Sequence, residues 1–417
     1  MELKRVVITG LGAITPIGNN FPDFWKNLCA GANGVCEITR FDASKFKTRF
    51  AFEVKNFDSL TYFDRKEARK YDLFSQFGIV AADEAITNSG ITPQNTDYND
   101  VGVIFSSGIG GITSFSEDEK EFFLGDGTPR FSPYLIPKLL PDLAAGHISI
   151  KYGFRGPNFA TLSACASSLN AIIESFNYIR YSRAKVIIAG GAEAPITEPG
   201  IGGFGNMKAL STRNDDYQTA SRPFDANRDG FVMGEGGGAL VFEELEHAKQ
   251  RGATIYGEIV GAGLSADAYH QTAPHPEGLG AYLSMKRAIE DAGLQPTDID
   301  HINTHGTSTP MGDTIEPMAI AKLFGEHAYN ISINATKSMT GHLLGGSGAI
   351  ESIASIMAVK DGIIPPTINH FTTDPAIDPK LDFTFNKAKV RNINTALCNA
   401  FGFGGHNASV LFKKFEE

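Results

Sequence analysis

Cysteine is scarce in this sequence, and the few cysteines present do not form a disulfide framework. Only four occur in 417 residues, at Cys29, Cys36, Cys165 and Cys398. They form no C-x-x-C pair and show no even spacing, whereas a disulfide-rich secreted domain or a redox pair would show one or the other. We therefore expect free thiols, of which one or more is buried or reactive.

Long apolar runs are missing as well. No stretch approaches the roughly 18 apolar residues that a membrane-spanning helix needs. The charged start, Met1 to Arg5, leads into only a short apolar run, so no secretory segment is recognised. We therefore expect a cytoplasmic protein with no membrane partner.

Positive charge is in deficit. Lysine and arginine number 37 against 47 aspartates and glutamates, which gives a formal net charge of −10. Nucleic-acid binding needs a basic surface, so no nucleic-acid partner is expected. One basic run places Lys66, Arg69 and Lys70 on a shared helix face. Such a run is either a solvated surface or a docking site for an acidic partner.

Glycine is abundant, and two glycine-containing patterns recur along the chain. The 417 residues, 45 of them glycine, are too many for one simple core. Residues 6–18 resemble residues 301–312, because both read as a strand, a glycine turn and the exit Thr-Pro-x-Gly. Residues 234–242 resemble residues 402–412 in the same way. We infer a duplicated chain with halves 1–255 and 256–417.

Apolar strands alternate with amphipathic helices in both halves, which is typical of α/β proteins. The clearest predicted strands are 101–105, 186–189 and 255–260, and the clearest predicted helices are 74–89, 281–292 and 347–359. Two such halves most simply pack as stacked sheets, with helices between and outside them.

Cys165 occupies the junction between a strand-like run and an amphipathic helix. Residues 158–162 predict the strand, and apolar residues at helical spacing follow from Leu169 to Ile179. The unpaired N–H groups and the dipole at a helix N-terminus lower the pKa of a thiol placed there. We therefore expect an ionised, nucleophilic thiol in a nucleophile elbow. The alternative is a small apolar residue that only packs.

Two histidines lie in loops that suit catalysis. His305 ends a strand-like run before a turn rich in hydroxyls, and His342 lies in a glycine-rich loop after Lys337. His301 and His305 have zinc-binding spacing, but residues four apart on a strand lie about 13 Å from each other, so no metal site is expected. Lys337 and Glu351 could form a partly buried pair. A cysteine with two histidines suits a thiol enzyme that stabilises an oxyanion, and a cysteine protease stays an alternative.

Four segments together resemble the signature motifs of the β-ketoacyl-acyl carrier protein synthases, and the resemblance covers essentially the whole chain. The motifs are Ala164 to Ser168, His305 to Asp313, Lys337 to His342 and Phe401 to Gly405. The resemblance implies a thiolase-like duplicated α/β fold of five layers, αβαβα, and a homodimer. It also implies an acyltransferase that acts as a condensing enzyme in fatty acid synthesis.

The resemblance assigns a role to each catalytic residue. Cys165 would attack the thioester of an acyl-acyl carrier protein and become acylated. Malonyl-acyl carrier protein would then lose CO₂ and condense with that acyl group to give a 3-oxoacyl product. His305 and His342 would donate hydrogen bonds to the enolate oxygen, while Lys337 and Glu351 would orient them.

The same resemblance implies roles for residues around this centre. The N–H of Phe403 would complete the oxyanion hole, and its side chain would gate the cavity. Thr307 and Thr309 would bind the phosphopantetheine arm, and Ile109 would reach the acyl pocket of the partner subunit. The acidic carrier protein would dock on Lys66, Arg69, Lys70, Arg130 and Lys208.

No cofactor is expected besides the phosphopantetheine that the substrate carries. A monovalent cation near Asn303, Glu351 and Asn399 is the one candidate ion. Two other classes with the same fold are alternatives. A thiolase would need a second cysteine in a C-x-G loop, where this sequence has Gly402 to Gly404, and a non-catalytic chain-length factor would lack the nucleophile at Cys165.

Overall fold

The computed structural model describes residues 3–416, and one ten-stranded sheet runs through them. The strand order is β10-β9-β13-β14-β8-β1-β7-β6-β4-β5. Its strands are β1 (Val6–Ile14), β4 (Val101–Ser106), β5 (Asn158–Phe159), β6 (Val186–Glu193), β7 (Gly236–Glu244), β8 (Gly257–Ala266), β9 (His301–Asn303), β10 (Ser332–Asn334), β13 (Thr395–Gly402) and β14 (His406–Lys413). Two short pairs stand apart from the sheet, namely β2 (Cys36–Glu37) with β3 (Phe50–Ala51) and β11 (Ile363–Ile364) with β12 (Lys389–Val390).

Helices pack on both faces of the sheet. They are α1 (Phe21–Cys29), α2 (Arg65–Ala68), α3 (Leu73–Ser89), α4 (Ile112–Leu124), α5 (Leu135–Leu139), α6 (Leu143–Tyr152), α7 (Ser167–Arg180), α8 (Glu198–Asn206), α9 (Leu245–Gln250), α10 (Leu279–Asp291), α11 (Gly312–Phe324), α12 (Lys337–Thr340) and α13 (Ser347–Asp361).

The sheet consists of two five-stranded halves with the same topology. In the N-terminal half, β1 pairs antiparallel with β7, β7 pairs antiparallel with β6, and β6, β4 and β5 are parallel. In the C-terminal half, β8, β14, β13, β9 and β10 follow in the same order and directions. A short antiparallel contact between β1 and β8 joins the halves.

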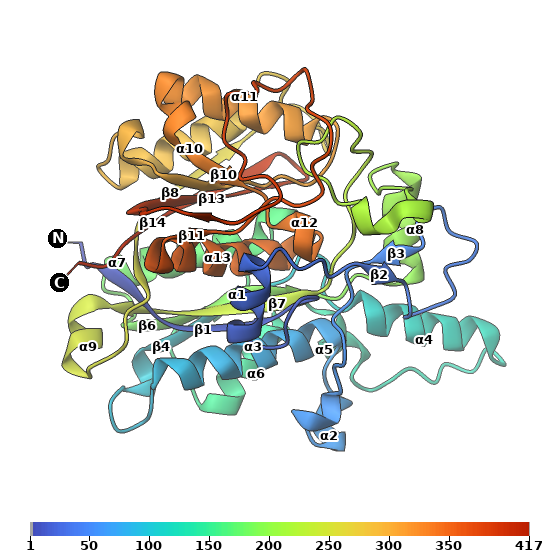
Figure 1. Ribbon diagram of the computed structural model, residues 1–417. Coiled ribbons are helices and arrows are strands. Elements are labelled where there is room, and N and C mark those ends of the chain that lie inside the picture. The colour runs from blue at the N-terminus through green and yellow to red at the C-terminus, as the bar shows by residue number, and fades with distance from the viewer. Residues whose placement is uncertain (1–2, 417) are drawn as a thin grey trace.

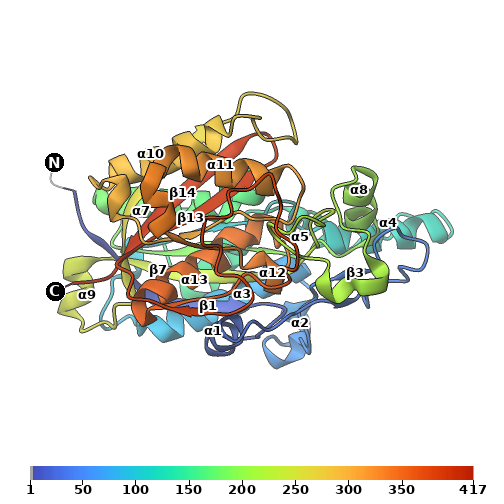
Figure 2. The same cartoon turned by 45° about the horizontal axis from the view of Figure 1, so that its top comes forward.

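The halves fold back on each other to give five layers, as Figure 1 shows from top to bottom. Helices α10 and α11 cover the C-terminal half-sheet, α7 and α13 fill the middle, and α3 and α6 cover the N-terminal half-sheet. Figure 2 shows the same stacking from another direction. Each half-sheet is buried on both faces, which explains its continuous apolar strands. The predicted five-layered, duplicated α/β fold is confirmed.

Of the two internal similarities that suggested a duplication, one relates equivalent strands and the other does not. Strands β7 and β14, within residues 234–244 and 402–413, hold equivalent places. The pairing of residues 6–18 with residues 301–312 is wrong as an equivalence, because β1 corresponds to β8 while β9 corresponds to β4. Those two segments both run from a strand into a turn, but they occupy different positions in the two half-sheets.

Glycine pairs in β1 and β8 explain how closely the outer helices approach the sheet. A Cβ at Gly10 or Gly12 would lie 2.2 or 2.0 Å from carbonyl oxygens of α3. A Cβ at Gly261 or Gly263 would lie 2.3 or 2.0 Å from carbonyl oxygens of α10. Only glycine fits such contacts, so each half carries the same helix-on-strand packing.

Among the helices of residues 3–416, none combines the length and the apolar character needed to cross a bilayer. The cytoplasmic location stays a prediction. The boundary at residue 255 also stays a prediction; it falls in the connection between α9 and β8.

Candidate active site

Cys165 lies at the centre of a tight turn that leads into a buried helix. The turn is a 3-10 segment, Ala164–Ala166, directly before α7. Ala164 has a φ of 51°, in the left-handed region that residues other than glycine rarely adopt. The Ser167 hydroxyl donates to the carbonyl of Ala164 at 2.7 Å and accepts from the N–H of Ser163 at 3.0 Å. These contacts hold the bend closed and keep Cys165 on the wall of a cavity.

The cavity, of about 450 Å³, brings together the residues predicted to be catalytic. Cys165, His305 and His342 all line it, although they come from three distant parts of the chain. The rings of the two histidines lie 5.3 Å apart between centroids, with an interplanar angle of 83°. Four further predicted residues line the same cavity: Thr307, Thr309, Lys208 and Phe403.

Both histidines are neutral in this environment. Burial lowers the pKa of His305 well below its usual 6.5, and the charge of Lys337 adds to that effect. Burial and the Lys337 charge likewise hold the pKa of His342 well below 6.5. A neutral imidazole carries one N–H donor, and both rings line the cavity that Cys165 also lines.

One ring nitrogen of His342 has a hydrogen-bond partner, and the tautomer decides which of the two donates. Its Nδ1 lies 3.0 Å from the hydroxyl of Ser347, the first residue of α13. When that hydroxyl donates, Nδ1 accepts and the proton stays on Nε2. Nδ1 of His305 has no hydrogen-bond partner among residues 3–416.

Lys337 and Glu351 form the ion pair that the sequence suggested, and the pair is fully buried rather than partly buried. Their charged atoms lie 2.5 Å apart, and each side chain is 1% exposed. Burial raises the pKa of Glu351 to about 7, against the opposing effect of the lysine. The pair places one cation beside the cavity.

Glu316 of α11 is a site residue that sequence reasoning missed. Its carboxylate accepts from the N–H groups of His305 and Gly306 at 2.9 and 3.0 Å, and from the Asn399 amide at 3.1 Å. Burial raises the pKa of Glu316 to about 7. The carboxylate therefore fixes the backbone that carries His305. The available signal was an acidic residue in the first turns of the helix after the His305 loop.

The Cys165 thiol differs from its predicted state. Burial raises its pKa to about 11, while the charge of Lys337 and the N–H groups of Phe403 and Cys165 act in the opposite direction. The prediction of an ionised resting thiol is therefore wrong, because the loss of solvent outweighs the favourable groups around the sulfur. Those two N–H groups lie beside the sulfur, where an oxyanion hole would need them.

Ile109 sits in a loop held by a second carboxylate that sequence reasoning missed. It packs against the apolar cluster that includes Cys165 and Leu344. Buried Glu193 accepts from four donors at 2.6 to 3.0 Å: the Ser107 hydroxyl and the N–H groups of Gly108, Ile109 and Gly345. Glu193 thus ties the predicted acyl-pocket loop to the turn before α13. The predicted contact of Ile109 with a partner subunit stays a prediction.

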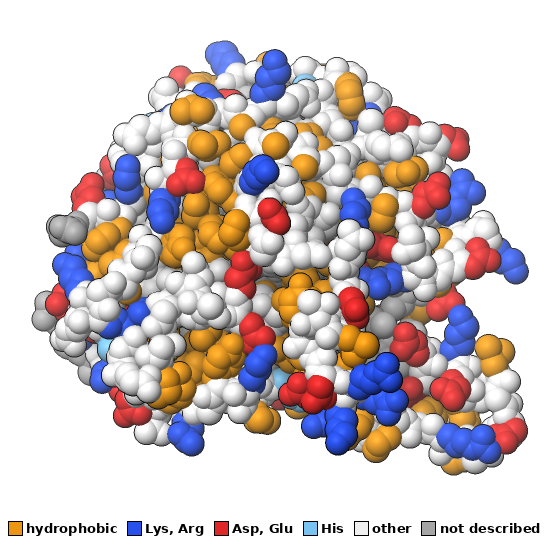
Figure 3. Space-filling model, turned by 60° about the horizontal axis from the view of Figure 1, so that its bottom comes forward, with side chains coloured by type: hydrophobic (Ala, Val, Ile, Leu, Met, Phe, Trp, Pro, Cys, Tyr) orange, Lys and Arg blue, Asp and Glu red, His pale blue; other side chains and the backbone are white. Residues whose placement is uncertain are grey.

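The residues predicted to dock a carrier protein do not form one patch on a single chain. Lys66 lies in α2, and Arg69 and Lys70 directly follow it; all three are exposed. Lys208 lies at the cavity just after α8, and α2 and α8 lie well apart in both ribbon views. Arg130 is exposed and pairs with Asp126 at 3.3 Å. Figure 3 shows a group of lysine and arginine side chains near the lower edge of one face, among acidic ones.

A buried cysteine and two neutral histidines, in one cavity of a duplicated five-layered α/β fold, define a thiolase-like thiol enzyme. The model of the β-ketoacyl synthase N-terminal domain matches residues 3–248, and that of the C-terminal domain matches residues 256–371. The chain therefore belongs to the β-ketoacyl synthase family.

Curated relatives are similar over nearly their full lengths. The 3-oxoacyl-acyl-carrier-protein synthase 2 of Synechocystis sp. is 48% identical, with 100% of this chain and 99% of the relative covered. The protein of the same name from Staphylococcus aureus is 49% identical, with 99% of both covered. Among solved structures, a type II polyketide ketosynthase bound to its acyl-carrier protein has a TM-score of 0.92 and 34% identity, covering 99% of this chain and 100% of its own. A β-ketoacyl synthase from Burkholderia phymatum has a TM-score of 0.91 with the same identity and coverage.

Proposed function

We propose that the chain is an elongating β-ketoacyl-acyl carrier protein synthase that condenses malonyl-acyl carrier protein with an acyl group held on Cys165. The products are 3-oxoacyl-acyl carrier protein and CO₂, in fatty acid elongation. The observation that carries the proposal is the meeting of one thiol and two neutral imidazoles in a single cavity. The full-length similarity to synthases of that activity supports it.

In the first half-reaction, the sulfur of Cys165 attacks the carbonyl of the acyl thioester. The new bond joins Sγ to the acyl carbon, and the bond to the phosphopantetheine sulfur breaks. The thiol proton ends on the departing phosphopantetheine thiol, by way of a neutral imidazole. Because the resting pKa of the thiol is raised by burial, proton removal accompanies the attack rather than precedes it.

In the second half-reaction, malonyl-acyl carrier protein binds and loses CO₂. The electron pair of the broken C–C bond forms an enolate, whose oxygen accepts hydrogen bonds from His305 and His342. The enolate carbon attacks the acyl-Cys165 carbonyl, and the sulfur leaves as a thiolate that takes up one proton from water. Neutral donors suit this step because they stabilise the developing charge without giving up a proton beforehand.

The surrounding residues have supporting roles. The N–H groups of Cys165 and Phe403 stabilise the tetrahedral oxyanion, and the Phe403 side chain gates the cavity between half-reactions. Gly402 and Gly404 flank it, and Gly404 has a φ of 89°, which favours glycine at this bend. Lys337 and Glu351 orient the histidines through their buried pair.

Substrates arrive on the phosphopantetheine arm of a carrier protein, and no resident organic cofactor is needed. The Thr307 and Thr309 hydroxyls, 3.0 Å apart, are placed to bind that arm. The carrier protein docks on Lys66, Arg69, Lys70, Arg130 and Lys208, and their separation on one chain fits a surface completed by a second copy. We therefore also propose a homodimer.

A monovalent cation fits a position between β9 and α13. Asn303 Oδ1 and Glu351 Oε2 are buried and lack hydrogen-bond partners within the part of the chain that the structure describes. Such oxygens are suitable ligands for a hard cation. Asn399 contributes less, because its oxygen already accepts from Ser409 at 2.8 Å. A bound cation would offset the carboxylate charge there and would take no part in bond breaking.

Intact-protein mass spectrometry tests the proposal directly. Incubation with an acyl-acyl carrier protein should add one acyl group to the protein but none to Cys165→Ala. Adding malonyl-acyl carrier protein should then discharge the acyl group and yield a 3-oxoacyl product. A cerulenin-type epoxide should label Cys165. Absence of both adduct and label would instead support the non-catalytic chain-length factor, and adducts from coenzyme A esters alone would support a thiolase.

A further inference from the structure

The loop between β9 and α11 carries His305 at one end and the two threonines at the other, without regular secondary structure. Residues 304–311 lie outside helices and strands. Ser308, between the threonines, has a φ of 67°, in the left-handed region. A non-glycine residue keeps such a conformation only where its surroundings hold it. The contacts that hold each end of this loop therefore decide where its side chains point.

The two ends of the loop are held by different residues. Glu316 holds the inner end through the N–H groups of His305 and Gly306. Arg228 holds the outer end: its Nε donates to the carbonyl of Thr309 at 3.0 Å. Its Nη2 donates to the carbonyl of Pro310 and to the hydroxyl of Thr314, both at 2.8 Å.

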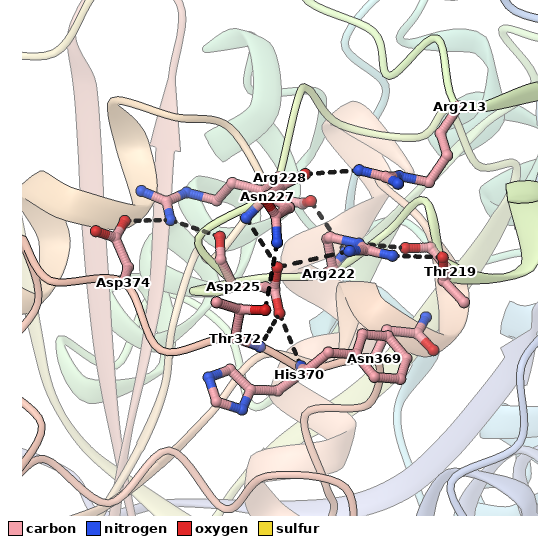
Figure 4. A network of polar contacts seen from close by, with 12 residues as sticks. Arg213, Thr219, Arg222, Asp225, Asn227, Arg228, Asn369, His370, Thr372 and Asp374 are labelled. Carbon is pink, nitrogen blue, oxygen red and sulfur yellow. Dashed lines mark hydrogen bonds and ion pairs between the residues drawn. The ribbon is translucent and has the colours of Figure 1, made fainter.

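Arg228 is itself fixed from its other side, as the network in Figure 4 shows. Its Nη1 donates to the carbonyl of Asp225 at 2.8 Å and to the carboxylate of Asp374 at 2.6 Å. The Asp225 carboxylate accepts from the N–H groups of Phe371 and Thr372, each at 2.7 Å. The Arg228 side chain is 4% exposed. It therefore joins three segments that are far apart in the sequence.

We propose that Arg228 is a positioning residue for the phosphopantetheine arm. It fixes the carbonyls of Thr309 and Pro310, and it thereby aims the threonine hydroxyls into the cavity. The inference rests on the proposed function, since it takes the substrates to arrive on that arm. The role requires arginine, because one planar guanidinium donates in several fixed directions whereas a lysine ammonium is a compact point charge.

A different residue holds the inner end of the loop, so loss of Arg228 should affect one kinetic constant more than the other. Because Glu316 fixes the backbone at His305, loosening the outer end leaves the imidazole in place. Loss of Arg228 should therefore weaken binding of the arm much more than it slows the chemistry. A purely structural role would lower kcat and stability together.

Steady-state condensation kinetics of Arg228→Lys test this. The KM for malonyl-acyl carrier protein should rise about tenfold, the effect of losing one or two hydrogen bonds to the loop. The kcat should stay within about a factor of two, since the histidines keep their place. Alkylation of Cys165 by iodoacetamide, which has no arm, should proceed at the wild-type rate.

Arg222→Lys is the matched control. Arg222 lies in the same cluster and is 6% exposed, but its side chain contacts Thr219 and Asp225 rather than the loop. Its KM should equal that of the wild type. Thr314→Val serves if Arg228→Lys does not fold. It keeps the arginine but removes the acceptor of Nη2 and the hydroxyl that donates to the Pro310 carbonyl at 3.0 Å. Its KM should also rise about tenfold, for two lost hydrogen bonds.

A double-mutant cycle with Thr309→Val gives the decisive readout. If Arg228 acts through the Thr309 hydroxyl, the KM effect of Arg228→Lys should shrink to less than half in the Thr309→Val background. The inference would be overturned if the KM effects of the two substitutions were additive. It would also be overturned if Arg228→Lys left the KM unchanged while the wild type was active, or lowered only the kcat. A wild-type protein that forms no 3-oxoacyl product would overturn the proposed function and this inference with it.

Discussion

Lys337 shows how a single buried charge sets the state of the whole site. Its charge lowers the pKa of both histidines and also lowers the pKa of the Cys165 thiol. For the imidazoles it adds to burial, and for the thiol it opposes burial. One cation thus favours neutral histidines and eases loss of the thiol proton, which are the two states that the proposed reaction needs.

Replacement of His342 should impair decarboxylation strongly. Loss of one donor to a developing oxyanion typically costs about 10²–10³ in rate, and we expect His342→Ala to lose that much malonyl decarboxylation. Release of labelled CO₂ measures it. His327→Gln is the control, because that ring bonds the Ile299 carbonyl and does not line the cavity. A loss below about tenfold would contradict the role, since one oxyanion-hole donor is worth more.

Alkylation of Cys165 should report the raised pKa of its thiol. Only the thiolate reacts, and below a pKa of about 11 the thiolate fraction grows about tenfold per pH unit. Iodoacetamide labelling of Cys165 should therefore rise from pH 6 to pH 9 without a plateau, after subtraction of the label that Cys165→Ser acquires at other cysteines. A plateau near pH 8 would show that the thiol is already ionised there.

Glu316 should make the folded protein less stable at alkaline pH. Burial raises its pKa to about 7 from 4.5, so the folded state holds this proton more tightly than the unfolded state. Its contribution to stability is fully present below about pH 4.5 and is lost as pH rises through 7. Urea unfolding should show that the stability lost between pH 5 and pH 8 is about 2 kcal/mol smaller in Glu316→Gln than in the wild type. Glu351, whose pKa is also raised to about 7, contributes equally in both proteins. An equal difference in both proteins would refute the assignment.

Residues whose side chains take part in the reaction could be predicted from the sequence. Residues whose side chains only bind backbone N–H groups could not. Cys165, His305 and His342 stand in recognisable motifs, so their meeting in one cavity was expected. Glu316 and Glu193 accept from N–H groups that every residue possesses, so no pattern identifies their partners. The thiol pKa was misjudged because burial depends on the whole fold and not on the local turn.

At the scale of elements, glycine decides where strands and helices touch. Gly10 and Gly12 in β1, and their counterparts in β8, let the outer helices lie directly on the strands. Gly203 in α8 behaves differently, because a Cβ there would meet no atom within 4 Å. The same residue type is therefore required in the strands and dispensable on the exposed side of α8.

Alanine substitution should separate these two uses of glycine. Gly12→Ala would place a Cβ 2.0 Å from the carbonyl oxygen of Ala81, and we expect a loss of about 3 kcal/mol or failure to fold. Gly203→Ala should stabilise the protein by about 0.5–1 kcal/mol, because alanine restricts the unfolded chain and favours the helix. Urea unfolding measures both, and a neutral Gly12→Ala would contradict the packing.

The equivalence of β1 with β8 could not be predicted from the sequence, because the role of their glycines depends on the helix that lies on each strand. The glycine pair of β1 matches that of β8 in spacing and in the helix it contacts. A Gly-x-Gly pattern alone suggests a turn or a ligand loop as readily as a close helix contact. The strand order and the positions of α3 and α10 reveal that these strands are the equivalent ones.

At the scale of the whole molecule, the two halves place different chemistry at equivalent turns. A 3-10 turn precedes each central helix: Ala164–Ala166 before α7 and Leu344–Gly346 before α13. Each begins with a residue of positive φ, 51° at Ala164 and 44° at Leu344. One turn carries the nucleophile, and His342 stands two residues before the other. Duplication therefore brought two helix starts to one cavity, and each half now supplies a different part of the reaction.

The two edges of the sheet differ in how open they are to the proposed second copy of the chain. At one edge, β10 is covered, because the N–H of Ile333 donates to the carbonyl of Asp382 at 2.7 Å. At the other edge, β5 ends the sheet, with Leu162 nearby 64% exposed and Ile150 of α6 79% exposed. An open edge strand flanked by apolar side chains favours pairing with another strand.

Sedimentation should therefore find the wild type as a dimer at micromolar concentration, and Leu162→Lys should shift it toward the monomer. A lysine there places charge on the proposed interface, where an unpaired buried charge is costly. Val390→Lys is the matched control, because Val390 is 84% exposed in β12, which pairs with β11 outside the sheet that β5 ends. Equal sedimentation of the two variants would exclude the β5 edge, whereas a dimer lost only in Leu162→Lys would place the second copy beside the turn that carries Cys165.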